Sequence, residues 1–292
     1  MELRHLRYFI ATAEEGTVSA AAARLHVTQP GLSRQLRQLE QELGVDLFDR
    51  ASGRLAIAGT GRALLPLARD LLNRAEAFKV AATFHAHGRL DRITVGAPTV
   101  TLTDVVAPFI VTLTTGDPIA SVFEVDGRDP LEALRRGADL AIGNIRPQAP
   151  YRARELAVLP VWAYVPAGHP WATRGRVALH ELLAETLICL PSDFSARQAL
   201  DAAVATAGAT YSVLLEAANG TVAQALTASG RGVTVASDDP RFGLVPLEID
   251  IDQRPLSIRL VAVWDSRHAA AATIDEFAER LGAFVRERYN VG

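Results

Sequence analysis

The chain has 292 residues, a length that favours two or more domains, and 49% of them are hydrophobic, which is enough for packed cores. No apolar run reaches the ~18 residues of a membrane span, and the single cysteine, Cys189, excludes an intramolecular disulfide framework, so we expect a cytoplasmic protein. The net charge of −3 is mildly asymmetric. The first 87 residues hold 11 basic and 9 acidic side chains, so a basic surface there would have to be local.

The first 43 residues predict three helices. Leu3, Leu6, Phe9, Ile10 and Ala13 form one apolar stripe of an amphipathic helix. Because the segment has acidic residues at its ends and no separate apolar core, we expect no signal peptide. Residues 19–25 predict a short alanine-rich helix, and residues 26–28 a tight turn into a third helix over residues 28–43. A short helix, a tight turn and a second helix with a polar outer face are typical of a helix-turn-helix.

The third helix has two distinct faces. Leu32, Leu36, Leu39 and Leu43 recur with a 3.6-residue period, Thr28 suits the N-cap, and Gly44 ends the helix. The opposite face carries Gln29, Pro30, Ser33, Arg34 and Arg37. An arginine fork matches guanine, a glutamine amide matches adenine, proline contacts a thymine methyl, and serine reaches bases or phosphate. We therefore assign Gln29, Pro30, Ser33 and Arg34 to base edges and Arg37 to phosphates or the minor groove. The alternative is an ordinary amphipathic helix with a solvated polar face.

A β-hairpin wing is expected after Gly44. Leu47 and Phe48 are apolar, residues 49–53 form a turn, and residues 54–57 alternate like a strand. Arg50 and Arg54 flank the tip, where they could reach phosphates or the minor groove. The alternative is an exposed polar hairpin without a partner.

Residues 60–87 predict a long helix with a coiled-coil seam. Its apolar positions step by four and three residues, which is a 3.5-residue repeat. They are Leu64, Ala68, Leu71, Ala75, Phe78 and Ala82. Because such a seam at a domain boundary needs a partner, we expect a homodimer, whose two reading heads would suit a two-fold symmetric DNA site.

From Gly88 onwards, apolar strand-like runs alternate with helical patterns. Strands are expected at residues 92–97, 119–125, 138–143, 161–165, 186–190, 213–217, 233–236 and 258–263. Helices are expected at residues 102–113, 130–136, 179–184, 196–207, 222–229 and 269–288. This alternation implies parallel sheets covered on both faces.

Three strand-to-helix turns offer polar groups where ligands of open α/β sheets bind. They carry Thr99, Val100 and Thr101; Ser192, Asp193, Phe194 and Ser195; and Asn219 with Thr221. Helix N-terminal amides and hydroxyls suit a carboxylate or another anion. The alternative is that these residues merely cap helices. Because Asp193 could accept a hydrogen bond from an amine or hydroxyl, we expect a small organic acid, which could be zwitterionic.

Signals for an enzyme, a cofactor or a metal are weak. The sequence has no Gly-x-Ser-x-Gly elbow, no Walker loop and no Cys-x-x-Cys pair. His85 and His87 are two residues apart in a helix and face different ways, and Cys189 lies in an apolar run. We therefore expect no enzyme activity, no cofactor and no metal.

The first 62 residues resemble the LysR-type transcriptional regulators. The resemblance is carried by the LRYF near the start, Ala21-Ala22 with Leu25, residues 28–34, Leu39-Glu40, Leu43-Gly44, and Leu47-Phe48 with Arg50. Residues 138–142, Val165-Pro166 with His169-Pro170, and residues 230–233 extend it more diffusely. Ala58 stands where the family usually has threonine, so we expect Thr60 to cap the linker helix.

The resemblance implies an α+β multidomain chain. A winged helix-turn-helix (residues 1–59) and a dimerising linker helix (residues 60–87) would precede an effector domain (residues 88–292) that resembles periplasmic binding proteins. Its two α/β subdomains would be residues 88–159 with 266–292, and residues 160–265. Expected partners are double-stranded DNA, a small-molecule effector, and other copies in a homodimer or homotetramer. RNA polymerase is a further candidate, and no membrane is expected.

The resulting hypothesis is a sequence-specific transcriptional regulator controlled by an effector bound between the subdomains. The alternative is a small-molecule-binding module or an enzyme that uses its N-terminal helices only for oligomerisation. A helix used only for dimerisation would present apolar residues where Pro30, Ser33, Arg34 and Arg37 stand.

Overall fold

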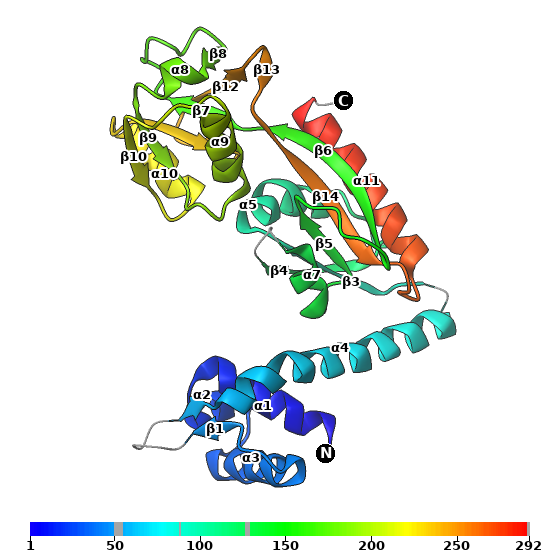
Figure 1. Ribbon diagram of the computed structural model, residues 1–292. Helices are drawn as coiled ribbons and strands as arrows, with labels where there is room; N and C mark the ends of the chain where they lie inside the picture. The colour runs from blue at the N-terminus through cyan, green and yellow to red at the C-terminus, as the bar shows by residue number, and fades with distance from the viewer. Residues whose placement is uncertain (50–54, 88, 126–128, 291–292) are drawn as a thin grey trace. The chain divides into compact units, whose positions relative to one another are not determined.

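A computed structural model describes residues 1–49, 55–87, 89–125 and 129–290 (Figure 1). The chain divides into two compact units. The first comprises residues 1–88 with residues 135–137, and the second comprises the remainder. Each unit has its own buried core.

The first unit contains the expected three helices and hairpin. They are α1 (Leu3–Glu15), α2 (Val18–Arg24), α3 (Gln29–Leu43), and the antiparallel pair β1 (Phe48–Asp49) and β2 (Ala56–Ile57). The Thr28 side chain accepts a hydrogen bond from the Gly31 N–H and caps α3, while Gly44 ends that helix in the left-handed conformation. The predicted helix-turn-helix and the predicted cap are therefore confirmed.

The core of this unit buries one stripe from each helix. Leu32, Leu36 and Leu39 of α3 are buried, and Phe9 meets Phe48 edge to face at 5.6 Å between ring centroids. Leu3 and Leu43, expected on the inner stripes, are 43% and 41% exposed because they lie at the free ends of their helices.

Glu40 fastens α3 to the hairpin. This glutamate is buried, and its Oε1 accepts hydrogen bonds from the backbone N–H groups of Leu47 at 3.0 Å and Phe48 at 3.2 Å. Because β1 begins at Phe48, one carboxylate fixes where the wing leaves the recognition helix.

The linker helix α4 (Gly59–His87) runs through Pro66 without a break. It begins one residue earlier than expected, and the Thr60 hydroxyl donates to the Asp46 carbonyl oxygen. The expected Thr60 cap is therefore wrong, because that hydroxyl is used to hold α4 against the loop after α3.

The second unit contains two sheets. The first has the order β4 (Ile119–Glu124), β3 (Arg92–Ala97), β5 (Leu140–Gly143), β14 (Ser257–Asp265) and β6 (Tyr151–Pro160). The strands β4, β3 and β5 are parallel, whereas β14 is antiparallel to both its neighbours. Helix α11 (Ala271–Tyr289) lies along β6 and β14 (Figure 1). The remaining helical segments of this subdomain are α5 (Thr99–Thr101), η2 (Leu102–Val106), α6 (Ala107–Ile110) and α7 (Pro130–Arg135).

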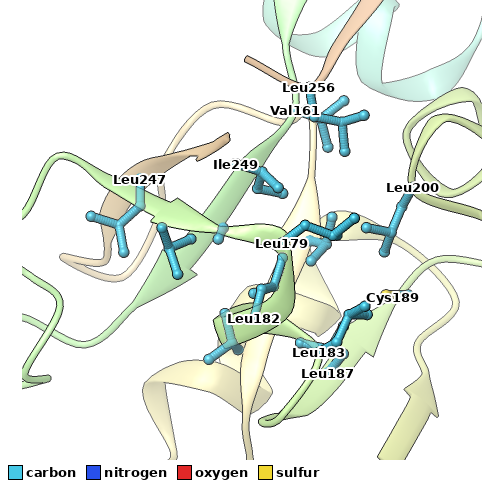
Figure 2. Close-up of a cluster of buried hydrophobic side chains, with 14 of the residues drawn as sticks. Val161, Leu179, Leu182, Leu183, Leu187, Cys189, Leu200, Leu247, Ile249 and Leu256 are labelled. Atoms are coloured by element: carbon cyan, nitrogen blue, oxygen red, sulfur yellow. The ribbon is translucent and has the colours of Figure 1, made fainter. Parts of the chain in front are cut away.

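The second sheet has the order β10 (Val213–Glu216), β9 (Thr186–Cys189), β11 (Val233–Ala236), β7 (Trp162–Val165), β12 (Val245–Ile251) and β13 (Arg254–Pro255), with β8 (Arg176–Ala178) paired to β12. Its helices are α8 (Leu179–Leu182), α9 (Ser195–Thr206) and α10 (Gly220–Ala228). Figure 2 shows the apolar side chains that fill this core, among them Leu187 and Cys189 from β9 and Leu200 from α9.

Two expectations about this unit were wrong. Both sheets are mixed rather than parallel, because β7 is antiparallel to β11 and β12, and β14 is antiparallel to β5 and β6. Residues 257–265 belong to the first sheet as β14, not to subdomain two. The chain crosses between the sheets at Pro160–Val161 and Leu256–Ser257, and Ser257 pairs with Pro160. The subdomains are therefore residues 89–160 with 257–290, and residues 161–256. Among the described helices, none is long and apolar enough to cross a membrane.

Candidate nucleic-acid interface and ligand site

The outer face of α3 is open to solvent. Gln29, Pro30, Arg34 and Arg37 are exposed, and Ser33 is half-buried. The leucine stripe positions this face, because burial of Leu32, Leu36 and Leu39 forces these side chains outward. No acidic side chain in the described part of the chain pairs with Arg34, so its guanidinium keeps its donors for another molecule. The Arg37 Nε donates to the Ser33 carbonyl oxygen at 3.3 Å.

A hollow of about 470 Å³ borders this face. Its wall includes Arg34, Gln35 and Gln38 from α3 and Tyr8 from α1. The ring Nε2 of buried His5 is 2.9 Å from Gln35 Oε1, which links α1 to the same side of α3. The recognition helix is thus held from two sides, by His5 of α1 and by the Glu40 contact with the hairpin.

The wing is present as β1 and β2, with Phe48 opposite Ile57. Arg50 and Arg54 lie outside the described residues. Their assignment to phosphates or the minor groove stays a prediction.

The expected dimerisation seam divides into two parts. Ala68 is buried and Leu64 is half-buried in the core of the first unit, so these two positions already have partners within the chain. Further along α4, Leu71 and Phe78 are 44% and 76% exposed. Ala75 is half-buried and Ala82 is exposed, and Leu67, outside the expected seam, is 57% exposed. The exposed apolar surface of α4 therefore extends from Leu67 to Ala82, beyond the part that packs in the core of the first unit.

Asn144, which was not among the expected site residues, contacts the second polar turn and follows a strand that is paired with the one before the first turn. Parallel pairing places Gly96 of β3 beside Ala141 of β5, so the chain beyond the two strands brings Thr99 and Asn144 to the same sheet edge. The Asn144 Nδ2 donates to the Ser195 Oγ of the other subdomain at 3.0 Å, and the Asn144 Oδ1 is buried without a hydrogen-bond partner. Asn144 directly follows the predicted strand 138–143, and that position could have indicated it.

The helices at these two turns begin without side-chain caps. Pro98 and Phe194 occupy the N-cap positions of α5 and α9, and neither provides a capping hydrogen bond. The first backbone N–H groups of a helix have no intrahelical partner, so both ends can donate to an anion. Thr101 is buried and Val100 is half-buried, whereas the Thr99 hydroxyl donates to Glu124.

Within the second turn, the side chains have different surroundings. Ser192 and Asp193 are exposed. Phe194 packs on the apolar cluster of Ile188 and Leu190, so it serves the core. The Ser195 hydroxyl is the group that reaches the other subdomain.

At the third turn, the polar groups are already paired with other residues of the same chain. Asn219 caps α10 by accepting from the Val222 N–H at 3.0 Å, and the Thr221 Oγ1 accepts from Arg241 Nε at 3.3 Å. The Asp238 carboxylate lies against Gly220, where an added β-carbon would approach its Oδ1 to 2.0 Å. Burial, more than the nearby Asp104 carboxylate, raises the pKa of Asp238 to about 6. Asn219 therefore caps a helix, which is the alternative to ligand binding at this turn. The Asp238 carboxylate already lies at the start of α10.

The bacterial regulatory helix-turn-helix model of the lysR family matches residues 3–62, and the LysR substrate binding domain model matches residues 86–286. The HTH-type transcriptional regulator TfdS of Cupriavidus pinatubonensis is 32% identical over 262 residues, which are 87% of this chain and 85% of that protein. ClcR of Pseudomonas putida, another HTH-type transcriptional regulator, is 44% identical over 95 residues, 32% of each chain.

Solved structures agree in fold. The crystal structure of CbnR, a LysR family transcriptional regulator, has a TM-score of 0.72 at 22% identity and covers 97% of this chain and 99% of that one. CbnR in complex with its target DNA has a TM-score of 0.69, also at 22% identity, over 97% of this chain and 100% of that one. The two family models together span nearly the whole chain, and they match the helix-turn-helix and the two-sheet unit separately. The chain therefore belongs to the LysR family of DNA-binding transcriptional regulators, with an N-terminal helix-turn-helix and a C-terminal effector-binding domain.

Proposed function

We propose that this regulator reads a two-fold symmetric DNA site with the outer face of α3 and responds to a small organic acid. The observation that carries the DNA part is the exposed, unpaired guanidinium of Arg34 on a helix held from two sides. Because Arg34 loses no internal partner on binding, its fork is free for a bidentate contact with guanine.

The base contacts are Gln29, Pro30, Ser33 and Arg34, and the backbone contacts are Arg37, Arg50 and Arg54. Arg37 has only one turn of helix between it and Ser33, so it extends the same face towards the phosphates. A dimerisation helix would instead present apolar side chains on this face, which weighs against the binding-module alternative.

Dimerisation is proposed through the exposed apolar surface in the middle of α4. Leu71 and Phe78 are exposed apolar side chains on one side of this helix, and a second copy would cover them. Two copies would place two reading heads on half-sites about one helical turn apart. We also propose that dimers can assemble into a tetramer and that the DNA-bound protein contacts RNA polymerase. Because a regulator must reach the bacterial chromosome, the proposed location is the cytoplasm.

The effector is proposed to bind at the junction of Thr99–Thr101, Asn144 and Ser195. Uncapped helix starts supply N–H donors for a carboxylate, and the unpartnered Asn144 Oδ1 can accept a hydrogen bond from a hydroxyl or amine of the same ligand. A small hydroxy or amino acid satisfies both requirements. Asp193 is exposed near this turn and can also accept from a ligand amine.

Selection of bound genomic fragments by the purified protein, at about 0.15 M salt, tests the DNA part. We expect an imperfect palindrome with two half-sites. Recovery of sequence-blind, salt-sensitive binding alone would contradict base reading by α3. The genes beside the selected sites would then narrow the choice of organic acids for ligand tests.

A further inference from the structure

A polar network joins the two subdomains of the second unit. Subdomain one provides Asp104 from η2 and Arg288 and Tyr289 from α11, while subdomain two provides Gln224 from α10 and Asp239 and Arg241 from the segment between β11 and β12. We call these six residues the inter-subdomain network. The proposed effector site uses none of them.

Both carboxylate oxygens of Asp104 accept hydrogen bonds from the other subdomain. Its Oδ1 accepts from the Arg241 guanidinium at 2.9 Å, and its Oδ2 accepts from the Asp239 backbone N–H at 2.9 Å. The Asp104 side chain is only 7% exposed, and that of Arg241 is 25% exposed. A charge so well buried is stable only while its partners remain in place.

Asp239 is held from both sides. Its Oδ2 accepts from Arg288 at 2.7 Å and its Oδ1 from the Tyr289 hydroxyl at 2.9 Å, both in the other subdomain. The same hydroxyl is 3.1 Å from the Asp104 carbonyl oxygen, so its one proton is shared between two acceptors. Within its own subdomain, the Asp239 carbonyl oxygen accepts from Gln224, which is fully buried.

The backbone connections between the two subdomains permit one subdomain to rotate relative to the other. Within the described residues, two connections, at Pro160–Val161 and Leu256–Ser257, cross between the sheets, and they lie side by side as paired strands. Two adjacent extended connections form a hinge. A rotation that moved η2 away from the segment between β11 and β12 would separate Asp104 from Arg241 and leave charges buried without partners.

The network is also joined directly to the proposed effector site. Asp104 lies in the helical segment that begins at Thr99, one turn beyond Thr101. Its segment η2 is π-helical, an uncommon local geometry that often occurs at functional positions. A ligand that pulls on the start of this helix therefore moves the carboxylate that holds the other subdomain.

We propose that the inter-subdomain network is a lock, which holds the two subdomains in one relative arrangement and must open before the effector domain can change shape. Identification of the ligand as its trigger rests on the proposed function, but the lock itself does not. It predicts one dominant arrangement in the ligand-free protein. Loss of Arg241 or of the Tyr289 hydroxyl would populate a second one.

The distance between the subdomains, measured by pulsed electron resonance on the full chain without ligand or DNA, tests the lock. Thr115→Cys and Ala184→Cys put spin labels on exposed positions, one in each subdomain, while native Cys189 is buried and stays unlabelled. Dilution with unlabelled protein removes distances between copies. We expect one narrow distance in the parent protein and a second distance in at least about a tenth of Arg241→Gln molecules.

Two further variants make the result decisive. Tyr289→Phe keeps every charge and should populate the second distance less than Arg241→Gln does, so it serves if Arg241→Gln fails to fold. Arg154→Gln is the matched control, because Arg154 also donates to a carboxylate, that of Asp275, but within subdomain one. Unchanged distances in Arg241→Gln and Tyr289→Phe, or an equal change in Arg154→Gln, would overturn the lock. Because no ligand is added, failure of the effector proposal would leave this result intact.

Discussion

The side-chain amide of Asn144 donates to the Ser195 hydroxyl at 3.0 Å and joins the end of strand β5 in the first subdomain to the start of helix α9 in the second. The same amide leaves its oxygen buried and unpartnered. A buried carbonyl oxygen without a donor costs free energy, and a ligand that supplies the donor recovers it. This relationship makes Asn144 the residue on which the effector proposal can be tested most directly.

Asn144→Ala should weaken the binding of the effector. In a thermal-shift screen of small hydroxy and amino acids, we expect a ligand at about 100 times its dissociation constant to stabilise the parent protein by about 2.7 kcal/mol. The same ligand should stabilise Asn144→Ala by at least about 1 kcal/mol less, which is the usual net contribution of a hydrogen bond. Thr221→Ala is the control, because Thr221 belongs to the turn that Asp238 already occupies. A ligand whose effect is lost in Thr221→Ala and kept in Asn144→Ala would place the site elsewhere.

Arg34→Ala should lower the affinity for the selected DNA site by about 1–3 kcal/mol and relax the choice of base at one position in each half-site. Arg37→Ala should weaken specific and random DNA alike, and should reduce the slope of log affinity against log salt by about 1. Fluorescence anisotropy with matched specific and scrambled duplexes at several salt concentrations measures both. Equal losses on the two duplexes for Arg34→Ala would contradict its assignment to a base.

Glu40→Ala should destabilise the first unit. The Leu47 and Phe48 N–H groups would lose their buried acceptor, at about 1–3 kcal/mol for each unsatisfied group. Glu40→Gln keeps an acceptor oxygen and should cost less. Urea unfolding of the full chain gives these differences in free energy. The control is Glu42→Ala, on the exposed side of the same helix, and a loss as large as that of Glu40→Ala would show that the hairpin contact is not the cause.

Asp238→Asn should stabilise the protein more at pH 7.5 than at pH 4.5. The folded pKa of about 6 lies above the ordinary 3.8, so between these values the folded protein binds a proton that the unfolded chain does not. Stability from this group therefore rises as pH falls through that window, and above it the buried carboxylate costs up to about 3 kcal/mol. Urea unfolding at both pH values should show a clearly larger gain for Asp238→Asn at the higher pH. An equal effect at both would mean that Asp238 titrates normally.

The Cys189 thiol should be inert in the folded protein. Burial raises its pKa to about 12, and the thiolate is the reactive form. We expect no reaction with a disulfide reagent on the scale of minutes, and complete reaction in denaturant. Fast reaction of the native protein would show that β9 opens readily. An accompanying loss of DNA binding, absent in Cys189→Ala, would indicate a redox role instead.

Local sequence patterns were enough to predict the helices and the hairpin of the first unit and most of the elements of the second. The leucine period of α3, with Thr28 before it and Gly44 after it, determines both the helix and the face that it exposes, because periodicity and capping act within a few residues. The same holds for the strands at residues 92–97 and 233–236, where a short apolar run is bounded by turn residues. The sequence motifs of the first 62 residues were also sufficient to indicate the family.

Only the tertiary structure decided which residues meet across long distances in the chain. Strand direction depends on pairing between distant segments, so the antiparallel β7, β12 and β14 could not be read from local alternation, and β14 changed the subdomain boundary. Asn144 and Ser195 are 51 residues apart, and Asp104 and Arg241 are 137 apart. No local pattern specifies such pairs, because their geometry depends on how two sheets and their connections pack. Local patterns thus predicted most of the elements, although β6 and β12 were not predicted as strands, and packing determined which polar groups of the two subdomains meet.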